Sequence, residues 1–168
     1  LNGAKTILDL GCADGIIMGM INRDKRFEVT GIDLFSPYLK KAKQLRVYSR
    51  LLKKDIRKLD IKENSYDVVL CSQTIEHLRK REGLVLLEKI EKIARMKVVV
   101  GTPHGQYHQA EYDGNVLHKH KSSWTAQDFE NEGFRVFGQG LRFIYHEGGL
   151  INNPVGRLKI FKIILFFI

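Results

Sequence analysis

Short apolar runs alternate with amphipathic stretches along most of the chain. Continuous apolar runs predict buried parallel strands, and apolar positions that recur every three to four residues predict helices that cover a sheet. In chain order the sequence predicts a strand over 6–10, a helix over 16–22, a strand over 27–32, a helix over 36–47, strands over 50–54 and 66–71, a helix over 82–94, a strand over 97–101, a helix after Thr125 and a strand over 134–137. This order is typical of a doubly wound α/β fold, with a mostly parallel sheet and helices on both faces.

Two of the predicted helices carry local signals at their ends. Ser36 offers an N-cap for the helix over 36–47, and Pro37 fits its first turn. Thr125 with Asp128 three residues later has the spacing of a capping box, and Gly133 is expected just past the end of that helix.

The length and composition predict a single domain over 1–168. With 168 residues, 43% of them apolar, the chain is long enough for one domain with its own core and too short for two ordinary domains.

The formal charge of +9 by itself favours an anionic partner, but the basic residues lie in short clusters without interleaved aromatic residues, which favours solvated helix faces. Cys12 and Cys71 lack metal-ligand spacing and no signal peptide precedes them, so we expect free thiols and a cytoplasmic location.

The two ends of the sequence predict a fragment, truncated at both ends. The first predicted strand begins within the first few residues, and a convincing antiparallel seventh strand is hard to place after 134–137. The apolar tail 158–168 is far shorter than the ~20 residues of a membrane-spanning helix. Two interpretations of the tail stay open: peripheral contact with a membrane surface through Lys159 and Lys162, or an element whose packing partner is missing.

The turn after the first predicted strand carries the first chemical signal. Gly11 and Gly15 are small residues where a strand reverses into a helix and where backbone can approach a ligand. Ala13 and Ile16 occupy the second and third glycine positions of the dinucleotide fingerprint, which argues against a pyrophosphate here. Asp33 follows the second strand, 18 residues after Gly15, where a carboxylate can accept hydrogen bonds from ribose hydroxyls. The pattern favours a nucleoside without a 2′-phosphate.

Five segments in a fixed order together resemble those of the class I S-adenosylmethionine-dependent methyltransferases. The segments are ILDLGCADG at 7–15, GID at 31–33, KDI at 54–56, SYDVV at 65–69 and TIEHL at 74–78. The chain is similar to the broad group that includes the ubiquinone and menaquinone biosynthesis enzymes, over nearly its whole length. The resemblance implies a Rossmann-like fold, with a cofactor-binding half over 1–102 and an acceptor-side loop, last strands and apolar tail over 103–168.

The resemblance also implies which residues bind S-adenosylmethionine and its product S-adenosylhomocysteine (SAH). They are Asp9, Gly11 and Gly15 at the methionine end, Asp33 at the ribose, Asp55 with Ile56 at the adenine, and Ser72 with Gln73 beyond the fourth strand, together with the neighbouring Cys12, Ala13, Asp14 and Leu34. Ala13 stands where the family usually has glycine and adds one methyl group beside the cofactor. Singly, each residue also has a structural explanation, as a turn glycine, a helix cap or a solvated acid.

Methyl transfer from a sulfonium is an in-line displacement, so catalysis can come from aligning donor and acceptor without a protein nucleophile. If the acceptor is a hydroxyl, a general base would help, and His77 is the nearest candidate in the sequence. The alternative is that the pair Glu76–His77 only orders the loop after the fourth strand.

Four histidines, His104, His108, His118 and His120, lie in or beside the polar loop after the fifth strand. Only two of them are close in sequence, and no cysteine or paired acids complete a recognisable ligand set. We therefore expect no metal site, and we expect this loop to cover the acceptor side of the fold.

The leading hypothesis is methyl transfer to a small-molecule or lipid-like acceptor, at oxygen or carbon. Nucleic acid is a second acceptor class, which Ser72–Thr74 disfavours because base amino methylases carry Asn or Asp, two prolines and an aromatic residue there; Cys71 also lacks the proline context of pyrimidine methylases. A non-catalytic cofactor-binding or interaction module is the alternative from another class. The acceptor and the oligomeric state are left open.

Overall fold

A computed structural model describes residues 3–105, 114–137 and 166–167. Its elements are β1 (Thr6–Leu10), α1 (Ile16–Ile21), β2 (Glu28–Asp33), α2 (Ser36–Gln44), β3 (Arg50–Lys53), the 3₁₀ helix η1 (Ile56–Lys58), β4 (Tyr66–Ser72), the 3₁₀ helix η2 (Ile75–His77), α3 (Lys80–Ile93), β5 (Ala94–Gly101), the 3₁₀ helix η3 (Val116–His118), α4 (Ala126–Asn131), β6 (Val136–Phe137) and β7 (Phe166–Phe167). The predicted alternation of strands and helices is confirmed.

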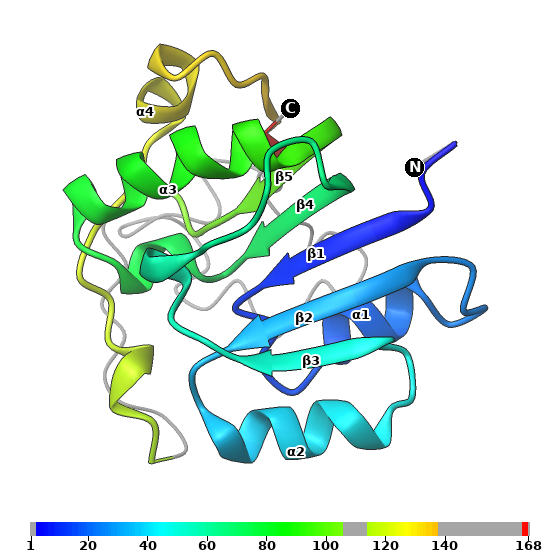
Figure 1. The fold of residues 1–168 in the computed structure, drawn as a ribbon. Helices are drawn as coiled ribbons and strands as arrows, with labels where there is room; N and C mark the ends of the chain where they lie inside the picture. Colours follow the sequence, from blue (N-terminus) through cyan, green and yellow to red (C-terminus); the bar gives the residue numbers. More distant parts are fainter. Residues whose placement is uncertain (1–2, 106–113, 138–165, 168) are drawn as a thin grey trace, which may run out of the picture.

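The described strands form one sheet in the order β3-β2-β1-β4-β5-β7-β6. Figure 1 shows the part of this sheet from β3 to β5. Strands β1 to β5 are parallel, and β7 pairs antiparallel with both β5 and β6. The strand order reverses between β1 and β4, because the chain first adds β2 and β3 on one side of β1 and then returns to the other. In open α/β sheets ligands bind outside the carboxyl ends of the strands at such a switch point.

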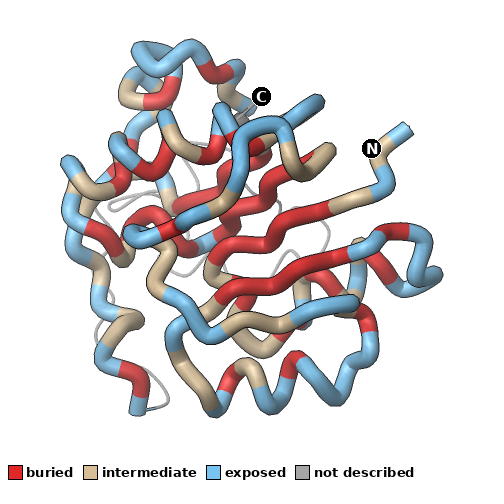
Figure 2. Tube along the Cα trace, in the orientation of Figure 1, coloured by how far each residue is buried: buried red, intermediate tan, exposed pale blue. Residues whose placement is uncertain are grey.

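The core lies on both faces of the central strands. Leu8 of β1 packs in one apolar cluster with Leu87 of α3, whereas Ile7 packs in a second cluster with Met18 of α1. Successive residues of a strand point to opposite faces, so β1 joins the two halves of the core. Figure 2 shows the central strands buried along most of their length.

The segment before α4 is fastened to α3 by Trp124. This side chain is fully buried and packs with Phe129 in the α3 cluster. Gly83 of α3 leaves room for the indole ring, since a Cβ there would lie 2.5 Å from Cζ2 of Trp124. The Lys80 ammonium lies 3.8 Å from the ring centroid and pairs with Asp128. The residues leading into α4 are therefore held against the first turn of α3.

The structure confirms one predicted helix start and corrects the other. Thr125 and Asp128 form the reciprocal capping box at α4, and Gly133 follows that helix with a φ of +83°. At α2 the N-cap is Phe35, and Ser36 is already helical with no side-chain capping bond. The Asp33 carboxylate accepts a hydrogen bond from the Phe35 amide, and this turn starts the helix one residue earlier than predicted.

The ends of the described chain refine the predictions for the last strands. The sixth strand is shorter than predicted, and Phe166–Phe167 supplies the antiparallel seventh strand that was hard to place in the sequence. Most of the apolar tail 158–168, including Lys159 and Lys162, lies outside the described residues. Within the described ranges no helix has the length and apolar character needed to cross a membrane. Cys12 and Cys71 are buried free thiols.

Candidate functional site

The carboxyl ends of β1 and β2 are joined directly by backbone hydrogen bonds. The amides of Gly11 and Cys12 both donate to the Ile32 carbonyl, at 2.8 and 3.1 Å. The turn then closes on itself, because the Gly15 amide donates to the Cys12 carbonyl at 2.9 Å. The Asp14 carboxylate accepts from the Ile16 amide at the start of α1. The residues predicted to frame a methionine end therefore form one ordered turn at the switch point.

The glycines of this turn are required by close packing as well as by backbone conformation. Gly11 has a φ of +67°, and a Cβ there would lie 2.2 Å from Oγ1 of Thr74. Gly15 has a φ of +82°, and its Cβ would lie 2.8 Å from the Tyr48 ring. Ala13 also has a positive φ, of 46°, a backbone conformation that glycine adopts at lower cost. The turn is thus wedged between the loops that follow β4 and precede β3.

Asp9 is a buried carboxyl group directly below the turn. It is 5% exposed and accepts a hydrogen bond of 2.8 Å from the Tyr48 hydroxyl. Burial raises the pKa of Asp9 to about 7, the Tyr48 hydrogen bond opposes this shift, and the nearby Asp33 carboxylate adds to it. A ligand with positive charge above this pair of carboxyl groups would favour the ionised form of Asp9.

We expect the contribution of Asp9 to the free energy of unfolding to fall as pH rises from about 4 to about 7. In the unfolded chain Asp9 ionises near its ordinary value of 3.8, whereas in the folded chain its pKa is about 7, so the folded state holds more protons in this window. The Asp9→Asn variant keeps an acceptor for Tyr48 and should lose this share of the pH dependence, up to about 4 kcal/mol in the free energy of unfolding.

Urea unfolding of both proteins at several pH values measures this difference. Glu76, whose pKa is also raised to about 7, adds a slope of the same sign that both proteins retain. Parallel stability curves for the two proteins would show that Asp9 does not ionise in this window.

Asp33 connects the ends of β1 and β2 through both carboxylate oxygens. Oδ2 accepts from the Ala13 amide at 2.9 Å, and Oδ1 accepts from the Phe35 amide at 2.7 Å. A carboxylate has about four acceptor positions, so each oxygen retains capacity for another donor. Leu34, the next residue, is 37% exposed at the same edge. The geometry is compatible with the predicted ribose contact.

Asp55 lies at the start of η1, after β3. Its side chain accepts from the Arg57 amide and forms an ion pair with the Arg57 guanidinium at 2.6 Å. These hydrogen bonds lower the pKa of Asp55, while the same guanidinium also reaches Glu82 of α3. Ile56 follows in η1 and packs partly buried against the core. Asp55 is thus an ionised cap, and its partner Arg57 links the predicted adenine-side loop to α3.

The end of β4 presents a hydroxyl group that is not satisfied within the described residues. Ser72 is 6% exposed, and its Oγ has no hydrogen-bond partner there. Gln73 has a φ of +51°, and its amide donates to the Gly101 carbonyl at 2.7 Å. Thr74 then turns its hydroxyl back to the Ser72 carbonyl at 2.9 Å. This turn places Ser72 and Gln73 beside the glycine turn that follows β1.

Glu76 and His77 of η2 lie beneath the segment that follows η3. Glu76 is 2% exposed, and its Oε2 accepts from the Thr102 hydroxyl at 3.0 Å. The Glu76 carbonyl accepts from the amides of Lys121 and Ser122, at 2.8 and 3.2 Å. Burial raises the pKa of Glu76 to about 7 and lowers the pKa of His77 to about 4. His77 is therefore neutral at pH 7 but only a weak base, and its catalytic role stays a prediction.

The structure brings together residues from several separate segments. The predicted cofactor residues lie in the last residues of β1, β2 and β4 and in the turns after β1, β2, β3 and β4. Figure 1 shows that these strand ends share one edge of the sheet. Of the histidines considered in the sequence, His118 and His120 contact the His77 ring, His104 pairs with Trp124 in a β-bridge, and His108 lies outside the described residues. Sequence reasoning missed Tyr48 and Thr102, because no local motif marks them. Thr74 begins the TIEHL segment, but the sequence assigned it no role in the site.

A depression of about 300 Å³ lies elsewhere, beside the last turns of α3. It is lined by Ile61 and by charged residues such as Glu88 and Lys92. These residues lie near the start of β5, at the edge of the sheet opposite the turns described above. The depression does not belong to the candidate site.

The chain matches known proteins over much of its length. Residues 7–97, more than half of the chain, match the family model described as a methyltransferase domain. The uncharacterized protein MJ0638 of Methanocaldococcus jannaschii is 29% identical over 132 residues, which cover 77% of this chain and 55% of that protein. This chain therefore spans about half the length of the curated relative that it matches.

Solved structures share the fold at low sequence identity. A SAM-dependent methyltransferase from Archaeoglobus fulgidus has a TM-score of 0.63 and 18% identity, with 86% of this chain and 70% of that chain covered. The plantazolicin methyltransferase BpumL in complex with SAH has a TM-score of 0.59 and 19% identity, with 76% and 53% covered. The predicted fold, a parallel α/β sheet of the Rossmann-like methyltransferase type, is confirmed. This chain belongs to the methyltransferase domain family.

Proposed function

We propose that the chain binds S-adenosylmethionine across the turns after β1, β2, β3 and β4 and transfers its methyl group to an acceptor. The observation that carries the proposal is the convergence of the glycine turn, Asp33 and the unsatisfied Ser72 hydroxyl at the strand-order reversal. The family membership and the SAH complex of the similar BpumL structure support it. S-adenosylmethionine supplies the methyl group on a positively charged sulfur.

The residues of this chain have distinct parts in the proposed site. In the proposed site the methionine part lies against the backbone of the turn at Gly11, and the Asp9 and Asp33 carboxyl groups are counter-charges for a cationic ligand. The free acceptor capacity of Asp33 suits the ribose hydroxyls. Ile56, beside the cap formed by Asp55, offers an apolar contact for the adenine, and the Gln73 turn borders the acceptor side.

We place the acceptor over η2 and the segment that follows η3. A small-molecule or lipid-like acceptor, methylated at oxygen or carbon, is favoured because the sequence around β4 resembles the quinone-pathway group. The low pKa of His77 makes it a poor general base, so the proposal assigns rate enhancement mainly to alignment of donor and acceptor.

Calorimetric titration with S-adenosylmethionine and SAH tests binding, and SAH release tests turnover. We expect saturable binding of both compounds and SAH release with at least one phenol, catechol or hydroquinone acceptor. Folded protein that binds neither compound would contradict the proposal. Binding without turnover on these acceptors or on RNA would favour a non-catalytic module.

A further inference from the structure

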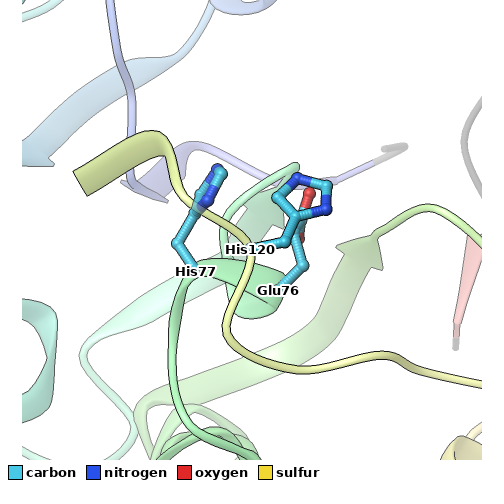
Figure 3. Close-up of side chains that lie close together, drawn as sticks. All are labelled: Glu76, His77 and His120. Carbon is cyan, nitrogen blue, oxygen red and sulfur yellow. The ribbon is translucent and has the colours of Figure 1, made fainter. Parts of the chain in front are cut away.

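Three side chains of the kinds that bind metal ions, those of Glu76, His77 and His120, lie close together over η2 (Figure 3). One candidate ligand atom from each residue lies within 4.8 Å of those of the other two. Glu76 and His77 come from the turn after β4, and His120 comes from the segment after η3, more than 40 residues later. The fold therefore assembles a set that histidine spacing in the loop could not reveal.

We propose that these three residues bind a divalent transition-metal ion. Two imidazoles and one carboxylate suit Zn²⁺, Fe²⁺ or Mn²⁺, and three protein ligands leave positions open for water or a substrate oxygen. Ligand atoms of a tetrahedral site lie about 3.4 Å apart, given metal–ligand bonds of about 2.1 Å. Candidate ligand atoms that lie within 4.8 Å of one another reach this spacing through side-chain movements of about an ångström.

Two polar atoms of the cluster, one on Glu76 and one on His77, have the capacity that a metal would use. The Glu76 side chain is almost completely buried, and its Oε1 has no hydrogen-bond partner within the described residues. Nδ1 of His77 is likewise a buried nitrogen for which the described structure provides no partner. Buried polar atoms are normally paired, and unpaired ones call for an explanation such as an ion. A metal ion would satisfy both atoms at once.

Neighbouring groups fix the orientation of these ligands. The Thr102 hydroxyl donates to Oε2 of Glu76 and leaves Oε1 for the metal. The His77 ring stacks on His118 at 5.6 Å between centroids, and the Lys119 backbone is its hydrogen-bond partner. Such outer groups hold metal ligands in position and typically change affinity by about 10- to 100-fold.

The segment that carries His120 is also held in place. The amides of Lys121 and Ser122 donate to the Glu76 carbonyl, and the Ser122 hydroxyl accepts from Trp124 Nε1 at 2.9 Å. Because Trp124 is fully buried against α3, the position of His120 over η2 is set by the core. The site is therefore largely preformed.

In the function proposed above, on which this role rests, the metal favours an acceptor whose hydroxyl oxygen can become a ligand. Metal binding lowers the pKa of such a hydroxyl, so its proton can pass to solvent without a strong protein base. The oxygen then forms a bond to the methyl carbon, and the electrons of the broken carbon–sulfur bond return to sulfur to give SAH. The acceptor class is thus a chelating hydroxyl compound such as a catechol.

Titration of the metal-free chain with Co²⁺ and Zn²⁺ tests the site. Co²⁺ gives visible absorption that reports nitrogen and oxygen ligation, and calorimetry gives the Zn²⁺ affinity. We expect the His120→Ala and Glu76→Gln variants to lose at least about tenfold in affinity. His104→Ala is the matched control, because His104 is an exposed histidine outside the cluster, and it should bind metal like the wild type.

Two outcomes would overturn the proposal: folded wild-type protein that binds neither ion, or undiminished affinity in folded His120→Ala protein. Circular dichroism checks folding of each variant. A chain that binds metal but not SAH would contradict the proposed function and leave the metal site standing. A chain that binds SAH but not metal would contradict only the metal site.

Discussion

Replacing Asp33 with asparagine is expected to weaken binding of S-adenosylmethionine and SAH by at least about 100-fold. Two charge-assisted hydrogen bonds to the carboxylate, from the Ala13 amide and from a ribose hydroxyl, are weakened or lost, at roughly 1.5–3 kcal/mol each. The amide keeps one oxygen, which can still accept from Phe35, but its nitrogen cannot accept from Ala13 or from a ribose hydroxyl. Calorimetric titration measures the change in affinity.

Two comparisons separate the ribose contact from damage to the turn. Asp24→Asn removes an exposed carboxylate from the loop between α1 and β2 and should leave affinity unchanged. An SAH analogue without the ribose hydroxyls should bind the wild type much more weakly than SAH does, whereas Asp33→Asn should hardly distinguish the two ligands. If the variant still distinguishes them as strongly as the wild type, another residue holds the ribose.

Caps and apolar spacing predict most of the helices and strands, because each of these signals depends only on residues that are close in the sequence. The capping box at Thr125 depends on one side chain and an amide three residues later, and it forms as expected. The helix over 82–94 was placed within two residues of α3 because its apolar face packs on the sheet at helical spacing. The N-cap of α2 is Phe35, one residue before the predicted Ser36, because the Asp33 carboxylate accepts from the Phe35 amide and starts the helix there.

Features that depend on distant partners could not be predicted in the same way. Phe166–Phe167 is too short for a propensity signal, and it is a strand because it pairs with both β5 and β6. Tyr48 carries no motif and matters only because its ring and hydroxyl reach Gly15 and Asp9. The same holds for His120, whose neighbours Glu76 and His77 are far away in sequence.

Gly11 shows how one residue ties the fold to the site, and the Gly11→Ala variant is expected to lose about 2–5 kcal/mol of stability. A non-glycine residue with a left-handed backbone costs about 1–2 kcal/mol, and overpacking a tight contact adds about 1–3 kcal/mol. The new Cβ would lie 2.2 Å from Oγ1 and 2.5 Å from Cγ2 of Thr74. Thr74 cannot move freely, because it is buried and bonded to the Ser72 carbonyl. Urea unfolding measures the loss.

The contact with Thr74 and the backbone strain can be separated by two further proteins. Gly133→Ala introduces the same side chain at a similar φ, of +83°, where nothing lies within 4 Å, so it should show the backbone cost alone. The double variant Gly11→Ala, Thr74→Ala removes the two closest atoms, Oγ1 and Cγ2, and leaves only Cβ of residue 74, at 2.9 Å. It should be less damaged than the sum of its single variants, by about 1 kcal/mol or more. Strictly additive losses would mean that the turn after β1 moves away from Thr74 on its own. The close approach of these two turns would then not be what makes glycine necessary at position 11.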